Sequence, residues 1–250
     1  MAIVYADTIE PRKPTQDITL GTTGETITLP GNELRVNTVK DKGGNTLWTS
    51  DGSGTLSSVS SGFSQDSQLL STQTASNITD VAFTSQLTST YSTYVFKWIE
   101  CQSVSDESSF SFNGSDDTSS HVYNVDKISN FYFTWNAASG GSPSLTQWDT
   151  GQLDNGDAGT IYQRLNMGTD DVINRPAASC SGELWLFEPA NTSKITNWIS
   201  VGTGIDSSPG VYGVYTGGYF DIAGAITAIN FQFYSPSTGW NGTVKLYGIL

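Results

Sequence analysis

Two short stretches decide the fold of this chain: residues 94–99, which read YVFKWI, and residues 229–233, which read INFQF. The first is apolar on both faces apart from Lys97, a pattern typical of a strand in the interior of a sheet. The second alternates between apolar and polar residues, which predicts a strand with one buried and one polar face. Similar short segments, separated by Gly, Asn, Asp and Ser, follow from about residue 78 onward. We therefore expect an all-β fold, an antiparallel β-sandwich with jelly-roll-like connections over 78–250. Only two brief windows, 79–86 and 223–228, are compatible with a helix.

The chain before residue 78 is thinner and more polar. Residues 1–16 contain Pro11 and Pro14, which block helix formation and predict an extended N-terminal arm. Residues 17–60 contain two Ile-Thr-Leu repeats around a Gly-containing turn and further short alternating runs, which predict a β-ribbon or thin β-prism. Its single apolar stripe is too narrow for an isolated core, so we expect sister chains to bury it. The Ser- and Gln-rich residues 61–77 are interpreted as a linker.

Composition restricts the classes of function. The 250 residues include 29 aromatic side chains (7 Trp, 11 Tyr and 11 Phe) and 26 Gly, which suits short strands with bulky core residues. The formal net charge of -13 argues against binding to nucleic acid, whose phosphates it would repel. The sequence has no apolar run long enough for a membrane span and no signal-peptide pattern, so we expect no membrane insertion and synthesis in a cytoplasm. Cys101 and Cys180 are predicted to be buried free thiols, with a disulfide as the alternative.

Residues for catalysis are scarce. His121 is the one histidine of the sequence, and although Asp126 lies near it, no nucleophile elbow accompanies the pair. Glu183 and Glu188 are five residues apart in a predicted strand, so they would face opposite sides and could not act as a glycosidase pair. Phosphate-loop and dinucleotide motifs do not occur in the sequence. We therefore expect no catalytic residues, no cofactor and no enzymatic activity.

Two kinds of binding site remain open. Asp149, Asp154 and Asp157 supply clustered oxygen atoms between glycines, which makes them weak calcium ligands, with an acidic turn as the alternative. Trp148, Trp240 and the tyrosines of 212–219 adjoin Gly-rich segments and could stack on sugar rings. Their alternative roles are core filling and a subunit interface.

Both ends of the chain resemble a known group of proteins. Residues 6–11 (ADTIEP) and 18–31 (ITLGTTGETITLPG), with 181–187 (SGELWLF) and 242–249 (GTVKLYGI), are similar to fibre-like virion proteins of tailed bacteriophages, marine phages in particular. The resemblance is weaker between about 100 and 175. It implies a non-enzymatic structural protein, usually a homotrimer, that is made in the cytoplasm of a host bacterium and located on the virion surface.

The length of the chain and its lack of extended repeats indicate which type of virion protein to expect. A long fibre has extended repeats, and here only the short Ile-Thr-Leu pair is present, so a capsid decoration (cement) protein or a short fibre is expected. Its partner would be the major capsid protein or a tail adaptor. The residues expected to dock are apolar or basic side chains of the N-terminal segment: Ile3, Tyr5, Arg12, Lys13, Ile18, Leu20, Ile27 and Leu29. The alternative function is a carbohydrate-binding or receptor-binding β-sandwich of a tail fibre, with a host-surface glycan as partner.

Overall fold

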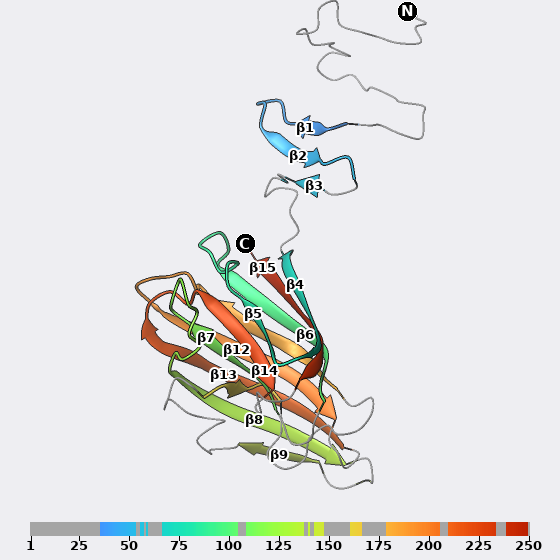
Figure 1. The fold of residues 1–250 in the computed structure, drawn as a ribbon, viewed down its shortest axis with the longest axis vertical. Helices are drawn as coiled ribbons and strands as arrows, with labels where there is room; N and C mark the ends of the chain where they lie inside the picture. Colours follow the sequence, from blue (N-terminus) through green and yellow to red (C-terminus); the bar gives the residue numbers. More distant parts are fainter. Residues whose placement is uncertain are drawn as a thin grey trace, which may run out of the picture. The chain divides into compact units, whose positions relative to one another are not determined.

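The chain forms two compact units, Met1–Phe63 and Ser64–Leu250, each of which is described by itself. The computed structural model describes residues 36–53, 56–57, 59, 67–104, 109–137, 140, 143–147, 161–166, 179–205, 210–233 and 239–249. All of the regular structure within these ranges is β-strand in antiparallel sheets, so the predicted all-β class is confirmed (Figure 1).

The described part of the first unit is a three-stranded sheet of order β1-β2-β3. The strands are β1 (Thr38–Lys40), β2 (Thr46–Ser50) and β3 (Leu56–Ser57). Asp41 closes the turn between β1 and β2, because its carboxylate accepts hydrogen bonds from the backbone and side-chain nitrogens of Asn45 at 2.8 and 2.9 Å. No described residue of this unit is buried, so this small sheet has no core of its own among those residues.

The second unit is a β-sandwich of an eight-stranded and a four-stranded sheet. The large sheet has the order β4-β15-β6-β11-β12-β13-β8-β9, and the small sheet has the order β10-β7-β14-β5. The strands are β4 (Ser67–Ile78), β5 (Asp80–Phe83), β6 (Thr93–Ser103), β7 (Phe110–Ser115), β8 (Lys127–Ala137), β9 (Ser144–Gln147), β10 (Gln163–Arg164), β11 (Cys180–Phe187), β12 (Ile195–Ile205), β13 (Gly210–Ala223), β14 (Ala228–Phe233) and β15 (Trp240–Ile249). The two-sheet architecture bears out the predicted sandwich, whereas its jelly-roll connections stay a prediction.

Aromatic side chains from both sheets fill the space between them. Phe231 of β14 lies 5.2 Å from Phe96 of β6 and 5.7 Å from Phe110 of β7, measured between ring centroids. Phe112 of β7 meets Trp198 of β12 edge to face at 5.1 Å. All five rings are at most 1% exposed. Because each buried ring removes a large apolar area from water, these aromatics explain how a chain of modest apolar content builds a core.

Glycines of the large sheet make room for two of the buried tryptophans, Trp98 and Trp198. A Cβ atom at Gly182 would lie 2.4 Å from Cζ2 of Trp98, and one at Gly202 would lie 2.9 Å from the same atom. A Cβ atom at Gly218 would likewise lie 2.8 Å from Cζ2 of Trp198. Each indole therefore occupies the place that a neighbouring side chain would otherwise take.

The structure corrects the predicted linker 61–77. Residues 67–77 belong to β4, which pairs with β15 from Ser67↔Ile249 to Ile78↔Trp240. The Ser- and Gln-rich composition misled the prediction because β4 is an edge strand with mostly exposed side chains. Its partner strand lies more than 160 residues away in sequence, so local patterning contained no sign of the pairing.

Three other local predictions differ from the structure. Residues 121–125 (HVYNV) are among the short segments after residue 78 that were expected to form strands, but they form a loop, in which His121 has a φ of 48° that a strand does not accommodate. The helix-compatible window 79–86 contains strand β5, and 223–228 contains the end of β13 and a bend. In β14, Asn230 was expected on an open polar face but is only 3% exposed.

Candidate interaction surface

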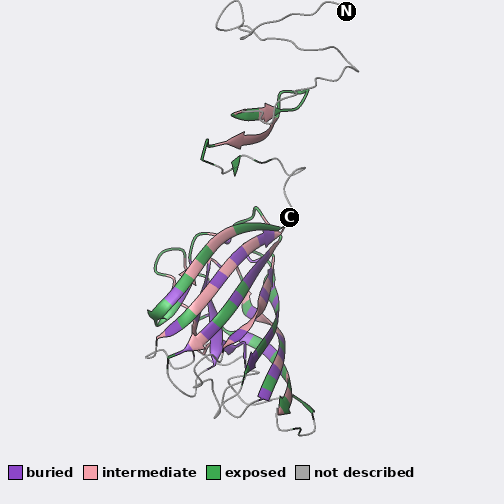
Figure 2. Ribbon diagram, turned by 90° about the vertical axis from the view of Figure 1, so that its right-hand side faces the viewer, coloured by how far each residue is buried: buried purple, intermediate pink, exposed green. Residues whose placement is uncertain are grey.

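The outward face of the eight-stranded sheet carries an unusual number of aliphatic and aromatic side chains. Strand β12 alternates strictly between exposed and buried residues, as the colours along the strands of Figure 2 illustrate. Its exposed positions are mainly aliphatic, whereas Trp198 shares the buried side with small and polar residues. The buried residues are Thr196, Trp198, Ser200, Gly202 and Gly204. The strand thus turns more of its aliphatic residues toward solvent than toward the core.

Trp198 explains this reversal. Its large indole fills the space on the inward side of β12 and packs edge to face on Phe112 of the opposite sheet. Only small or short side chains fit beside it, so the aliphatic residues of β12 are left on the other side. A strand that exposes its aliphatic face breaks the usual pattern, and such departures are expected at functional surfaces.

Strand pairing gathers these residues into one patch. Val201 of β12 lies opposite Tyr215 of β13, and Tyr215 lies opposite Tyr132 of β8. The exposed fractions of these three side chains are 41%, 52% and 38%. We call the outward residues of 128–136, 199–205 and 211–219 the apolar face; they are Ile128, Asn130, Tyr132, Thr134, Asn136, Ile199, Val201, Thr203, Ile205, Val211, Gly213, Tyr215, Gly217 and Tyr219.

The apolar face has no charged residue, although the chain has a net charge of -13. Charges lie beside it, on the strands β6, β11 and β15 and at the exposed Asp221 of β13. There, Lys97 pairs with Glu183 at 3.8 Å, and its ammonium lies 5.7 Å from the centroid of the Tyr247 ring. Like-charged copies of this protein could therefore approach one another through the apolar face with little repulsion.

Two shallow hollows mark the same side of the sheet. One, of about 470 Å³, is lined by Gly217 and Gly218 together with Phe187, Ile128 and Tyr219. The other, of about 600 Å³, lies between Lys97 and Tyr215 and includes Gly182 and Gly202. Hollows in an apolar sheet face offer sockets for side chains of a partner.

The outer side of the four-stranded sheet is a different environment, a partly buried polar cluster. Asn230 donates a hydrogen bond from Nδ2 to Asp80 Oδ2 at 2.7 Å and accepts one from the Tyr162 hydroxyl at 3.2 Å. Burial, with the Asp80 charge nearby, raises the pKa of Tyr162 and of Tyr123 above the ordinary tyrosine value. Raised values keep both phenols neutral, so they act as hydrogen-bonding groups and not as bases.

Lys127 is the most perturbed base of this region. Burial lowers its pKa to about 7, while the Asp126 charge acts in the opposite direction. Its Nζ donates to Asn113 Oδ1 at 2.7 Å, to the Ile161 carbonyl at 2.8 Å and to the Val125 carbonyl at 3.1 Å. A lysine with a pKa near 7 is a common catalytic group. Here the amine is enclosed by its three acceptors, and the side chain ties β8 to β7 and to residue 161, which is a structural role.

The two cysteines lie opposite each other in neighbouring strands, at the register position Cys180↔Cys101. Both are buried and free, which confirms the predicted state. Burial raises the pKa of Cys101 to about 12 and the pKa of Cys180 well above its ordinary value. Both are therefore neutral thiols that pack as small apolar groups.

Several predicted site residues lie outside the described ranges, and the two glutamates considered as a catalytic pair are not brought together. The docking residues, which all precede residue 36, and the calcium ligands Asp149, Asp154 and Asp157 lie outside the described residues. Within the described ranges, no group of three or more His, Cys, Asp or Glu side chains could hold a metal ion. Glu183 and Glu188 form separate ion pairs, with Lys97 and with Lys194.

Two of the five predicted sugar-stacking aromatics are buried. Trp240 is 0% exposed and packs on Phe110, and Tyr212 is 8% exposed, so neither can stack on a sugar. Trp148 lies outside the described residues, while Tyr215 belongs to the apolar face. Sequence reasoning overlooked the apolar face because an alternating strand pattern does not reveal which of its two sides is covered.

A scan against protein-family models, a search of curated proteins and a search of solved structures each found no match to this chain. The described residues also include no helix that is long and apolar enough to cross a membrane.

Proposed function

We propose that this chain is a non-enzymatic structural protein of a tailed-phage virion surface, a capsid decoration protein or short fibre that assembles as a homotrimer. The observation that carries the assembly part is the apolar face, where β12 and β13 present Ile199, Val201 and Tyr215 to solvent at 41 to 52% exposure. The virion part rests on the resemblance of residues 6–31, 181–187 and 242–249 to such proteins.

The occupant of the apolar face in this proposal is another copy of the chain. The face lacks charges, so it is a place where copies of a protein with net charge -13 can meet with little repulsion. Closed threefold assembly through such a face would cover every copy of it and stop growth at a defined size. The β1-β2-β3 sheet, which has no buried residue among those described, would gain a core from its sister chains.

The assembly is tested by measuring the mass of the full-length protein with light scattering. A trimer of the 26.8 kDa chain has a mass of about 80 kDa. Val201→Asp places a carboxylate in the middle of the apolar face and should weaken association by about 100-fold, about 3 kcal/mol, because an unpaired charge would be buried. Val122→Asp is the matched control, since Val122 is a valine of 52% exposure in a loop between β7 and β8.

A monomeric native protein at all accessible concentrations would refute self-association. An unchanged trimer for Val201→Asp, with native thermal stability in both variants, would refute the apolar face as the interface. The location is tested separately by deleting residues 1–30 and quantifying the protein in purified particles. Incorporation should be lost while the β-sandwich stays folded, and normal occupancy would contradict docking through the N-terminal segment.

A further inference from the structure

We infer that the loop end of the sandwich beside β6 and β11 contains a binding site for a neutral saccharide, built from Tyr91, Glu188 and Asn191. These residues line a cavity of about 390 Å³, together with Ser89, Thr90, Ser92 and Ala190. That volume is within the range of about 300–1,000 Å³ that is typical of small-molecule sites. The inference concerns residues away from the apolar face and does not depend on the proposed assembly.

Two loops meet at this cavity because the strands that carry them are paired. Thr93 at the start of β6 lies opposite Phe187 at the end of β11, so the loops before and after these residues are neighbours. The backbone N–H of Glu188 donates to the Ser92 carbonyl at 2.7 Å, which fixes the two loops to each other. Residues that are almost a hundred positions apart in sequence therefore face one cavity.

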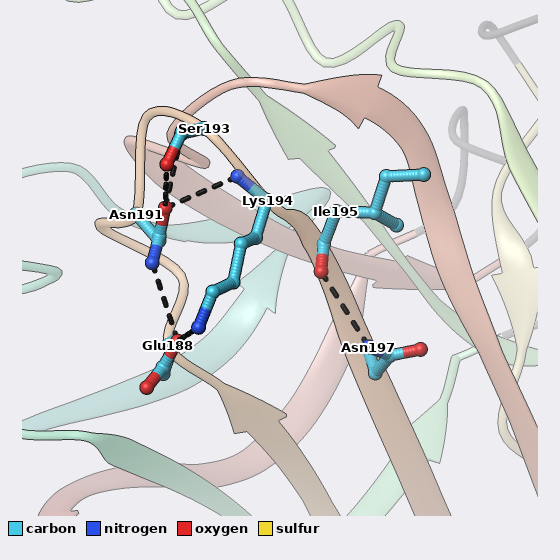
Figure 3. A network of polar contacts seen from close by, with 6 residues as sticks. All are labelled: Glu188, Asn191, Ser193, Lys194, Ile195 and Asn197. Atoms are coloured by element: carbon cyan, nitrogen blue, oxygen red, sulfur yellow. Dashed lines mark hydrogen bonds and ion pairs between the residues drawn. The ribbon is translucent and has the colours of Figure 1, made fainter.

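The turn after β11 holds its polar groups in a fixed arrangement, which Figure 3 shows. Asn191 Oδ1 accepts hydrogen bonds from the backbone nitrogens of Ser193 and Lys194, at 2.9 and 3.1 Å. Its Nδ2 donates to Glu188 Oε2 at 3.2 Å, and Lys194 Nζ binds the same oxygen at 3.3 Å. Because these contacts all use Oε2, the other carboxylate oxygen points away from them and is available to accept hydrogen bonds from a ligand (Figure 3).

The backbone of Glu188 is strained at this position. Its φ is 49°, in the left-handed region that residues other than Gly rarely adopt, and it directly precedes a proline. Such conformations cost free energy and occur preferentially where a side chain has to be aimed at a ligand. The strain is thus an observation, independent of the cavity, that points to the same carboxylate.

Tyr91 supplies the apolar part of the site. Its ring packs against Gly248 of β15, where an added Cβ atom would come within 2.5 Å of ring atoms, and its hydroxyl donates to Gln68 Oε1 at 2.6 Å. Both contacts fix the ring, which is half-buried and lines the cavity. A rigid aromatic surface beside hydrogen-bonding groups matches a sugar ring, which has apolar C–H faces and hydroxyl edges.

The balance of charge between Glu188 and Lys194 favours a neutral ligand over a cationic one. Lys194 already compensates the Glu188 carboxylate through the 3.3 Å ion pair. Ser89, Thr90, Ser92 and Asn191 also line the cavity, and their hydroxyl and amide groups are neutral donors and acceptors. A ligand with several hydroxyls can use all of these groups without introducing an unpaired charge.

Saturation-transfer NMR on the full-length protein tests this inference, with D-glucose, D-galactose, D-mannose and N-acetyl-D-glucosamine as probes at millimolar concentration. At least one sugar should receive saturation, and titration should yield its dissociation constant. Glu188→Gln keeps the shape of the side chain but removes its charge, and should weaken binding by about tenfold or more, since hydrogen bonds to charged groups are the stronger ones. Tyr91→Ala should abolish transfer.

Glu100→Gln is the control, because Glu100 is an exposed glutamate with a similar φ of 51° that lies toward the other end of β6 from Thr93, and it should leave binding unchanged. Thermal melting of each variant distinguishes loss of the site from loss of the fold, and Glu188→Gln retains a readout if Tyr91→Ala unfolds. Absence of transfer to all four sugars would overturn the inference. Equal binding by the native protein and folded Glu188→Gln would overturn it as well, because the site would then lie elsewhere.

Discussion

Replacing Gly182 with alanine should destabilise the β-sandwich strongly, although the change adds one methyl group. The new Cβ atom would lie 2.4 Å from Trp98 Cζ2, 2.4 Å from the Val201 carbonyl oxygen and 2.6 Å from the Gly202 Cα atom. Ordinary contacts between carbon atoms are about 3.5–4.0 Å, so each of the three atoms would have to retreat by about 1 Å.

None of these three atoms can retreat easily. Two belong to the backbone of β12, which is paired with every residue of β11. The third belongs to Trp98, which is 1% exposed and packs on Phe110 at 5.8 Å. Overpacking a core costs about 1–3 kcal/mol, and we expect about 3 kcal/mol here because the clash involves backbone atoms on one side. For a domain of this size the melting temperature should fall by about 6–12 °C.

Gly204→Ala provides the matched control in the same sheet. Gly204 is also a buried strand glycine, but the nearest atom to its added Cβ would be Cys180 Cβ at 3.4 Å, an ordinary contact. Its free energy of unfolding in urea should stay within about 1 kcal/mol of the native value, because a tolerated Gly-to-Ala change also restricts the unfolded chain. Equal midpoints for Gly182→Ala and Gly204→Ala would refute the explanation that Trp98 occupies the glycine's side-chain space.

Three further predictions concern stability. The pKa of Lys127 is lowered to about 7 in the folded protein, so the unfolded chain binds more protons above that pH. The free energy of unfolding should therefore rise by about 2 kcal/mol between about pH 6 and 8.5. Lys127→Met should abolish this rise in urea titrations. The pKa of Cys101 is raised to about 12, so its contribution to stability should be lost as the pH increases above about 9, and Cys101→Ala should reduce that loss. Asn230→Ala removes the 2.7 Å hydrogen bond to Asp80 and should cost about 2 kcal/mol by chemical denaturation, whereas an unchanged midpoint would contradict a structural role for the polar cluster.

Local patterning was sufficient for the all-β class and for the central strand β6. Residues 94–99 were expected in the interior of a sheet, and β6 indeed lies between β15 and β11. The buried thiols of Cys101 and Cys180 were likewise predictable, since both cysteines adjoin apolar strand sequences. A period of two in side-chain direction is a local property of an extended chain, so it can be read directly from consecutive residues.

Local patterning could not distinguish a polar, mostly exposed edge strand from a linker. The polar residues 67–77 resemble a flexible connector, and only pairing with β15 makes them strand β4. Trp240 adjoins a Gly-containing segment and looked available to a sugar, but its indole is buried and packs on both Phe110 and Phe233. Both outcomes depend on contacts between segments that are distant in sequence.

The sequence by itself determined that this chain forms an antiparallel β-sandwich with an aromatic core, because strand periodicity and turn residues act over a few positions. The tertiary structure alone decided which face of β12 is covered, because the indole of Trp198 occupies the inward side and Ile199 and Val201 are left exposed to solvent. It also decided that Tyr91 and Glu188 line one cavity, since strand pairing between β6 and β11 joins their loops. Which surfaces meet is set by the summed packing of the whole domain, and no short stretch of sequence contains that information.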